Sequence, residues 1–231
     1  SIDGWVQDRA DRRSEQQYLQ MLHRDLELMR DQLEIYTEFE QFNLQSGFQV
    51  LEAIREGAGG FDPVELRTQL SNMGSRKTLR LTSATYTDLI STGSLQLIDD
   101  RELRDHILRY FAEVSRVERV IEKNNTVFVD QMFFPFLLEK GISFVPGSAA
   151  TLREAALQAS QQFLREELGE DYGVPMDEVL TRPSEASSWE DIRRMTQMRT
   201  FVASIGLANA KMLTGETMAL ADAIAGQLEL P

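Results

Sequence analysis

Histidine is the side chain most often used for proton transfer near neutral pH, and it occurs only twice in this chain, as His23 and His106. Carboxylates flank both histidines in the sequence. A di-iron helical bundle would need Glu-x-x-His pairs, but the residues three positions before the histidines are Gln20 and Leu103. We therefore expect both histidines on exposed helix faces. A metal or hydrolytic site that joins them to carboxylates is the alternative.

Nucleophile motifs are missing from the sequence. The chain has no cysteine, which excludes disulfides, thiolate catalysis and thiolate metal sites. Neither a Gly-x-Ser-x-Gly turn nor a phosphate-binding Gly-x-x-x-x-Gly-Lys loop is present. The Ser/Thr-rich run over 82–94 is interpreted as helix caps and not as a polar pocket. We predict no catalytic residue, no cofactor and no metal ligand, and hence a protein that is not an enzyme.

Three asparagines interrupt the apolar stripes of the long predicted helices, at Asn43, Asn124 and Asn209. Other polar residues in or beside these stripes are Glu40, Arg199 and Glu216. A buried amide without hydrogen-bond partners costs about 1–3 kcal/mol, so buried asparagines need polar company. The hypothesis is a polar layer inside a bundle. Such a layer would either fix the register of the helices or line a small polar ligand cavity. The alternative to a polar layer is that at least one of the asparagines lies at the surface.

Charge and hydropathy limit the partners. Lys plus Arg number 24 against 37 acids, and the net charge of −13 argues against nucleic acid as a partner. The densest acidic stretch, residues 166–191, is interpreted as a solvated loop. No run of about 18 apolar residues is present, and the best run, residues 132–138, is interpreted as buried core.

The first element is expected to be one helix over residues 3–56, ended by the glycines of 57–60. Its apolar residues alternate at spacings of three and four, as in a helix packed lengthwise on others. The positions of this stripe are Leu19, Leu22, Leu26, Met29, Leu33 and Tyr36, then the polar Asn43, and then Val50 and Ile54. The residues before Tyr18 are too polar for this packing, so we expect them to project or to lie near an interface.

Two short helices and a second long one follow. Asp62 and Pro63 start a helix that stops near Gly74, and residues 83–92 form another that ends at a left-handed Gly93. Asp99 and Glu102 predict a capping box for the second long helix. Its stripe is Leu103, Ile107, Tyr110, Val114, Val117, Ile121, Asn124 and Phe128, with a kink expected at Pro135 and an end at Gly141.

The remaining residues predict a short extended piece over 142–145, a helix over 151–168 and a loop over 169–187 that holds Pro175 and Pro183. A last long helix is expected to open at Ser187 or Ser188. Its stripe includes Ile192, Met195, Val202, Ile205, Asn209, Met212, Ala219 and Ala223. The fold class is therefore all-α, an elongated bundle of three long helices plus several shorter ones. Residues 1–17 are expected to be the membrane-proximal start of the first helix and residues 18–231 a single bundle domain.

Two blocks of the sequence resemble an uncharacterised family of bacterial single-span, membrane-anchored helical proteins. The first is Trp5-Val6-Gln7-Asp8-Arg9 leading into Tyr18-Leu19 and Leu22-x-x-Asp25-Leu26. The second runs from Tyr86-Thr87-Asp88-Leu89 through Ser91-Thr92-Gly93-Ser94-Leu95-Gln96-Leu97-Ile98 to Leu103-Arg104-Asp105-His106-Ile107 and Tyr110. The resemblance implies a membrane helix upstream of Ser1, and it transfers no catalytic residue.

These observations lead to a functional expectation. We expect a non-enzymatic, membrane-tethered helical domain that binds an unknown protein partner or self-associates. Its place would be the bacterial inner membrane, with a single span and the helical domain on the periplasmic side. The alternative is a sensory bundle in which a small ligand shifts helix packing and signals along the first helix.

Overall fold

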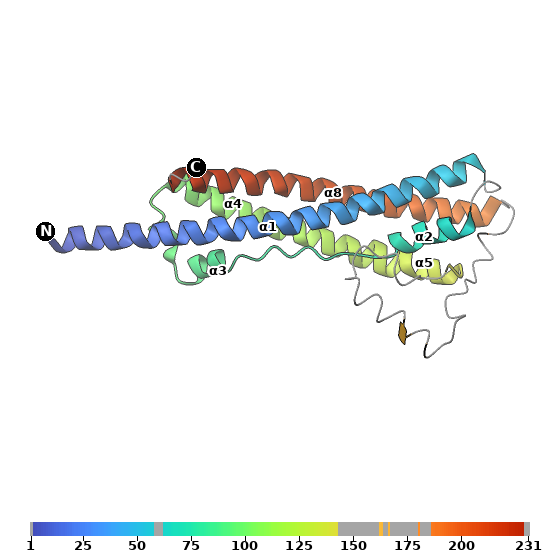
Figure 1. Cartoon of the computed structure of the whole chain (residues 1–231), viewed down its shortest axis with the longest axis horizontal. Coiled ribbons are helices and arrows are strands. Elements are labelled where there is room, and N and C mark those ends of the chain that lie inside the picture. The colour runs from blue at the N-terminus through green and yellow to red at the C-terminus, as the bar shows by residue number, and fades with distance from the viewer. Residues whose placement is uncertain are drawn as a thin grey trace. The chain divides into compact units, whose positions relative to one another are not determined.

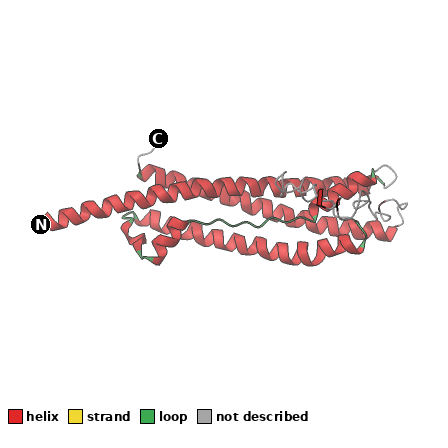
Figure 2. Ribbon diagram, turned by 60° about the horizontal axis from the view of Figure 1, so that its bottom comes forward, coloured by secondary structure: helices red, strands yellow, loops and turns green. Residues whose placement is uncertain are grey.

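The computed structural model describes residues 2–57, 62–142, 162, 163, 166, 180 and 186–228, with the side chains of 2–8 and 186–188 left aside. Helices account for most of these residues, and no strand occurs among them (Figure 2). The elements in chain order are α1(Ile2–Glu56), α2(Pro63–Met73), α3(Ala84–Ser91), the 3-10 helix η2(Ser94–Leu97), α4(Arg101–Asn124), the π-helix η3(Asn125–Phe133), α5(Phe134–Glu139) and α8(Ala186–Gln227) (Figure 1). The predicted all-α class is confirmed.

The chain packs as two compact units. Unit 1 comprises residues 1–36, 79–120 and 208–231, and unit 2 comprises residues 37–78 and 121–207. The helices α1, α4 and α8 contribute residues to both units. The single domain over 18–231, preceded by a membrane-proximal start over 1–17, stays a prediction.

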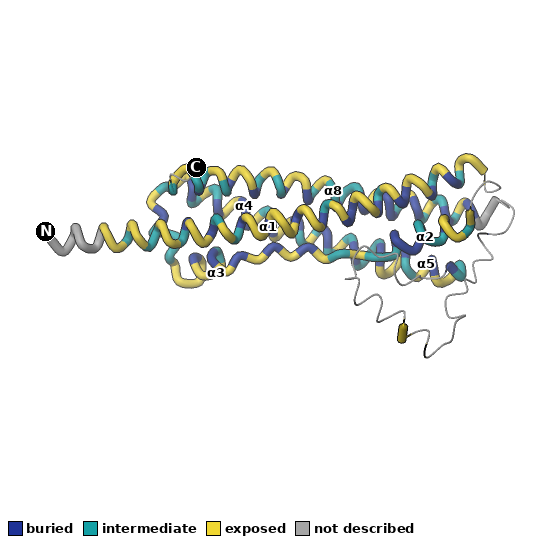
Figure 3. The backbone as a smooth tube through the Cα atoms, in the orientation of Figure 1, coloured by how far each residue is buried: buried dark blue, intermediate teal, exposed yellow. Residues whose placement is uncertain are grey.

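The apolar stripe of α1 is buried as expected. Leu22, Leu26, Met29 and Leu33 have no exposed surface, and Tyr36 is almost as well covered. Figure 3 shows the resulting alternation of buried and exposed positions along the helix. Burial of this stripe stabilises a 55-residue helix that the chain could not maintain on propensity alone.

In unit 1, the start of α3 is fixed by side chains of two elements. Ser83 is its N-cap, and its hydroxyl oxygen accepts a hydrogen bond from the Tyr86 amide at 2.9 Å. The carboxylate of Asp25 on α1 accepts from the Ser83 hydroxyl at 2.7 Å and from the Thr85 amide at 3.1 Å. A carboxylate here satisfies orphan amides and complements the positive end of the helix.

The sequence predicted the glycine that follows α3 correctly, but it predicted the wrong N-cap residue for α4. Gly93 has φ 72° and ψ 11°, the predicted left-handed conformation. The cap of α4 is not Asp99 but Asp100, whose Oδ1 accepts from the amides of Glu102 and Leu103. The predicted capping box is therefore wrong by one residue, because Glu102 lies in the first turn only two positions after the cap.

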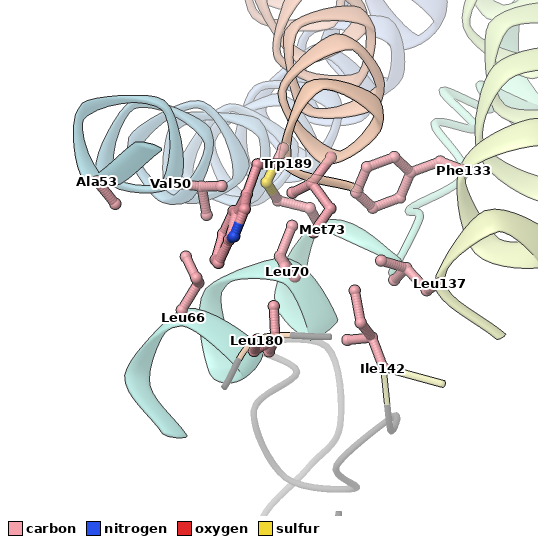
Figure 4. Packing of buried hydrophobic residues seen from close by; sticks show 11 residues of the cluster. Val50, Ala53, Leu66, Leu70, Met73, Phe133, Leu137, Ile142, Leu180 and Trp189 are labelled. Atoms are coloured by element: carbon pink, nitrogen blue, oxygen red, sulfur yellow. The ribbon is translucent and has the colours of Figure 1, made fainter. Parts of the chain in front are cut away.

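Unit 2 has an apolar core to which several elements contribute. The helix α2 starts as predicted at Asp62, whose Oδ1 accepts from the Val64 amide at 2.9 Å, and its C-cap is Gly74. Side chains from α1, α2, η3, α5 and α8 converge in this core (Figure 4). The buried residues of this cluster are Val50, Ala53, Leu66, Leu70, Met73, Phe133, Leu137, Ile142, Leu180, Trp189 and Ile192.

The predicted second long helix changes its winding halfway. After Ile121 the buried positions advance by four, to Asn125, Val129, Phe133 and Leu137, whereas the predicted Asn124 and Phe128 are only half-buried. The π-helix η3 explains this shift, because its wider turn carries the buried stripe one residue further along the chain. Pro135 sits in the first turn of α5, just after η3 ends, where its missing amide is tolerated. Gly141, with φ 70°, follows the end of α5 as expected.

The stripe predicted for α8 is displaced by about one residue. The residues it packs inward are Ile192, Thr196, Arg199, Ala203, Gly206, Ala210, Leu213, Thr217, Leu220 and Ile224. Of the predicted positions, Ile192 and Val202 are buried, Met195, Ile205, Asn209 and Ala223 are half-buried, and Met212 and Ala219 are exposed. Small and hydroxyl-bearing residues form much of the inward face, so hydropathy alone points to the neighbouring face. The helix also begins at Ala186, just before the predicted serines.

Several expectations lie largely outside the described residues. They are the helix over 151–168, the loop over 169–187 and the extended piece over 142–145. Most of the acidic stretch over 166–191 falls there as well. Within the expected loop, the described residues Leu180, Ala186 and Ser187 are helical, so the loop prediction is wrong at these positions. Among the described helices, none offers a stretch of sufficient length and apolarity to traverse a lipid bilayer.

Candidate functional site: a buried polar layer in unit 2

The side chain of Arg199 on α8 is fully buried and bonds to the end of α2. Its Nε donates to the main-chain oxygen of Met73 at 2.8 Å, and its Nη2 donates to that of Ser75 at 3.2 Å. Carbonyl groups at the end of a helix lack intrahelical donors and carry the negative end of the helix dipole. Arg199 therefore caps the C-terminus of α2 with a cation from another helix.

Glu40 on α1 supplies the opposite charge. Its Oε2 lies 3.7 Å from Nη1 of Arg199, and its side chain is 2% exposed. Removing both charges from water is expensive, and their mutual attraction offsets that expense only when the remaining polar atoms also find partners. The contacts of Arg199 with Met73 and Ser75 supply acceptors for two of the three guanidinium nitrogens, and the third, Nη1, faces Glu40.

Further buried polar groups surround this ion pair. Asn43, one turn after Glu40, donates from Nδ2 to the main-chain oxygen of Phe39 at 3.1 Å. Within the described part of the chain, Asn43 Oδ1, Asn72 Oδ1 and Thr196 Oγ1 are buried and meet no hydrogen-bond partner. Such orphaned acceptors are uncommon in protein interiors, and they mark the layer as the chemically distinctive region of unit 2.

The six residues predicted for a polar layer separate into two groups. The structure brings Glu40, Asn43 and Arg199 together in the interior of unit 2. Asn124 also belongs to unit 2 but is half-buried, and its neighbour Asn125 is the buried amide, donating to the Lys77 oxygen at 3.0 Å. Asn209 and Glu216 belong to unit 1, where both are half-buried.

The sequence patterns did not predict the burial of the hydroxyls of Ser46, Thr196 and Thr200 or of the amides of Asn72 and Asn125. A usable signal existed for Thr196, which lies three residues before Arg199 in an unbroken three-and-four spacing. A signal also existed for Asn125, which is four residues from Ile121 and from Val129. Hydropathy marks neither position as buried, because both residues are polar.

Unit 1 holds both histidines, each half-buried on its helix. Across the described ranges, no group of three or more carboxylate or histidine side chains has an arrangement that would hold a metal ion. His106 lies at a groove between α4 and α8. The two sequence blocks that carry the family resemblance also meet in unit 1, since the Tyr18 hydroxyl donates to Asp88 at 2.8 Å and Asp25 bonds to the start of α3.

A line of exposed aliphatic side chains runs along α1 in unit 1. Met21, Leu28 and Ile35 recur every seven residues and are 50%, 63% and 51% exposed. They lie outside the stripe that α1 buries. The packing of the described residues of unit 1 therefore leaves these three side chains exposed.

Comparison with known proteins gives no further guide. No protein-family model, no curated protein and no solved structure matches this chain.

Proposed function

We propose that the chain is a non-enzymatic, membrane-tethered helical domain that works by binding a protein partner or by self-assembly. The tether rests on the resemblance of residues 5–26 and 86–110 to single-span bacterial proteins. Protein binding rests on the exposed line of Met21, Leu28 and Ile35, which we call the α1 seam.

The spacing of the α1 seam is its distinctive property. Single exposed aliphatic residues are ordinary, but seven-residue spacing puts these three on one face, about 10 Å apart along the helix. That arrangement is one half of a helix–helix packing seam. Arg24 and Asp31 lie between the aliphatic residues and carry opposite charges, so another helix can approach without net repulsion. The α1 seam is therefore suited to a helical partner or a second copy.

The absence of cysteine makes a site-specific test simple. A Leu28→Cys variant labelled with a photo-crosslinker should crosslink to a partner or to a second copy, and mass spectrometry would identify which. The double variant Leu28→Glu/Ile35→Glu should abolish the complex, seen as a return to monomer mass in light scattering. The control, Gln16→Glu/Gln20→Glu, adds the same charge at exposed α1 positions away from the face of the α1 seam and should retain it. A monomer that gives no crosslink in cells would refute the proposal.

The location is proposed on the resemblance alone. A single inner-membrane span should place residues 1–231 in the periplasm. Alkaline phosphatase fused after residue 231 of the full-length protein should then be active, whereas green fluorescent protein fused at the same place should be dark. The reverse pattern would place the domain in the cytoplasm.

The buried polar layer favours a second candidate, a sensory bundle for a small polar ligand that signals along α1. The orphaned atoms of Asn43, Asn72 and Thr196 are groups that such a ligand could satisfy. A ligand that binds only the native state raises the melting temperature, so a thermal-shift screen of polar metabolites tests the idea. A shift that disappears in Asn43→Leu supports a sensor, and no shift with any compound argues against it.

A further inference from the structure

A groove of about 750 Å³ lies between α4 and α8 in unit 1. Its wall on α4 carries three arginines at helical spacing, namely Arg109, Arg116 and Arg119, together with His106 and Glu113. Glu216 lines it from α8. The whole chain has 13 more acidic than basic residues, whereas arginines outnumber glutamates in the lining of this groove.

The arginines of the groove differ in their partners. Arg116 holds Glu113 through two hydrogen bonds, of 2.8 Å from Nε and 2.5 Å from Nη2, and these bonds lower the pKa of Glu113. Arg109 donates only to the main-chain oxygen of Asp105, at 3.2 Å. Over the residues for which the structure gives side chains, no carboxylate lies within ion-pair distance of Arg109 or Arg119.

The spacing of these two arginines indicates the size of a ligand. They are ten residues apart on α4, which is about 15 Å along the helix. We expect a ligand that pairs with both arginines in extended conformations to be elongated and to carry at least two negative charges about three helical turns apart.

The surroundings of the groove favour a helix over a flexible anionic chain. Ala112 contributes exposed apolar surface to the lining, and the Tyr110 ring behind it is almost fully buried and is fixed by the hydrogen bond of its hydroxyl with Thr217 at 2.7 Å. On α8, the residues four before and three after Glu216 are Met212 and Ala219, both exposed. A groove between two helices with an apolar floor and charged edges is the usual receptor for an amphipathic helix.

We propose that this groove binds an acidic amphipathic helix of another protein, with carboxylates paired to Arg109 and Arg119. The proposal uses a different face from the α1 seam, and it adds the chemistry of the partner to the proposed function. Because the two faces are separate, each can fail without the other.

The test measures binding of a fluorescent helical peptide to the whole chain by anisotropy. The peptide carries two glutamates about eleven positions apart on one face and leucines beside them, and a matched peptide has glutamines instead. The glutamate peptide should bind, and its affinity should fall with added salt. The double variant Arg109→Gln/Arg119→Gln should bind it about ten-fold more weakly, since each exposed ion pair contributes up to a few-fold.

Two controls separate this effect from net charge and from the α1 seam. Arg30→Gln/Arg101→Gln also removes two exposed positive charges from unit 1, outside the groove lining, and should bind like wild type. Leu28→Glu/Ile35→Glu should also leave peptide binding unchanged, even where it abolishes a complex through α1.

Several outcomes would overturn the inference. They are no binding of the glutamate peptide, equal binding of the glutamine peptide, or an equal loss in the two arginine variants. Binding of phosphatidylglycerol vesicles that is lost in Arg109→Gln/Arg119→Gln would assign the groove to lipid instead. Competition by inorganic phosphate beyond its ionic-strength effect would contradict an extended ligand.

Discussion

Arg199 on α8 and Met73 at the end of α2 are joined by a buried hydrogen bond of 2.8 Å between the guanidinium Nε and the main-chain oxygen. The same guanidinium lies 3.7 Å from the Glu40 carboxylate on α1. One side chain thus links three helical segments of unit 2 through polar contacts in its interior. This arrangement makes the end of α2 depend on a charge that only a tertiary contact supplies.

Replacing Arg199 should destabilise the chain strongly. Arg199→Met leaves Glu40 buried without its cation and the carbonyls of Met73 and Ser75 without donors, so we expect a loss of about 3–5 kcal/mol. Glu40→Gln/Arg199→Met removes both charges and should recover part of that loss. Urea unfolding followed by circular dichroism measures both variants. A loss below about 1 kcal/mol in Arg199→Met would show that the pair is not integral to the fold.

Gly47 is required by the close approach of α1 and α8 in unit 2. A Cβ atom at this position would lie 2.1 Å from Oγ1 and 3.1 Å from Cβ of Thr200. We expect Gly47→Ala to cost about 1–3 kcal/mol, as other overpacked cores do, and Thr200→Ala to rescue part of it by removing the nearer atom. Gly215→Ala is the control, because a Cβ there meets nothing within 4 Å. That control should stabilise the helix by up to about 1 kcal/mol, and thermal unfolding distinguishes the two glycines.

Sequence patterns predicted the helices more reliably than the face each helix buries. The α1 stripe was predicted well because Leu22, Leu26 and Leu33 are large and apolar, so spacing and hydropathy agree. The α8 stripe was not, because its inward face uses Ala203, Ala210 and Thr217. A buried threonine satisfies its hydroxyl within its own helix, as Thr217 does by donating to the Leu213 oxygen at 2.7 Å. Burial of such a residue depends on what packs against it.

The polar layer shows a similar limit. Glu40, Asn43 and Arg199 could be named from the sequence because charged and amide residues stand out in apolar stripes. The choice between Asn124 and Asn125 could not be made, since it depends on the π-helical winding of η3 and on the distant oxygen of Lys77. The α1 seam and the arginine groove were also missed, because the spacing of an exposed stripe does not distinguish it from a buried one until the buried face is known.

Asp25 should be necessary for the start of α3 in unit 1. Its carboxylate accepts hydrogen bonds from the Ser83 hydroxyl and the Thr85 amide, so Asp25→Ala removes a helix cap that comes from another element. We expect a loss of about 1–2 kcal/mol and faster amide hydrogen exchange in residues 84–87. Asp31→Ala on the same helix removes only an exposed pair with Arg30 and should cost less than about 0.5 kcal/mol. Equal effects of the two variants would contradict this role.

Tyr110 should make the stability of the chain fall at high pH. Burial raises the pKa of its phenol from 10.0 to about 12, while the hydrogen bond with Thr217 opposes this shift. The native state then holds the phenolic proton more tightly than the unfolded state does. This stabilisation is fully present below pH 10 and is lost as the pH rises from 10 through about 12, amounting to about 2–3 kcal/mol. Tyr110→Phe should remove this part of the pH dependence. Absorbance at 295 nm should show a late tyrosine ionisation in the wild type whose amplitude falls by one tyrosine in Tyr110→Phe, whereas an unchanged late ionisation in that variant would refute the prediction.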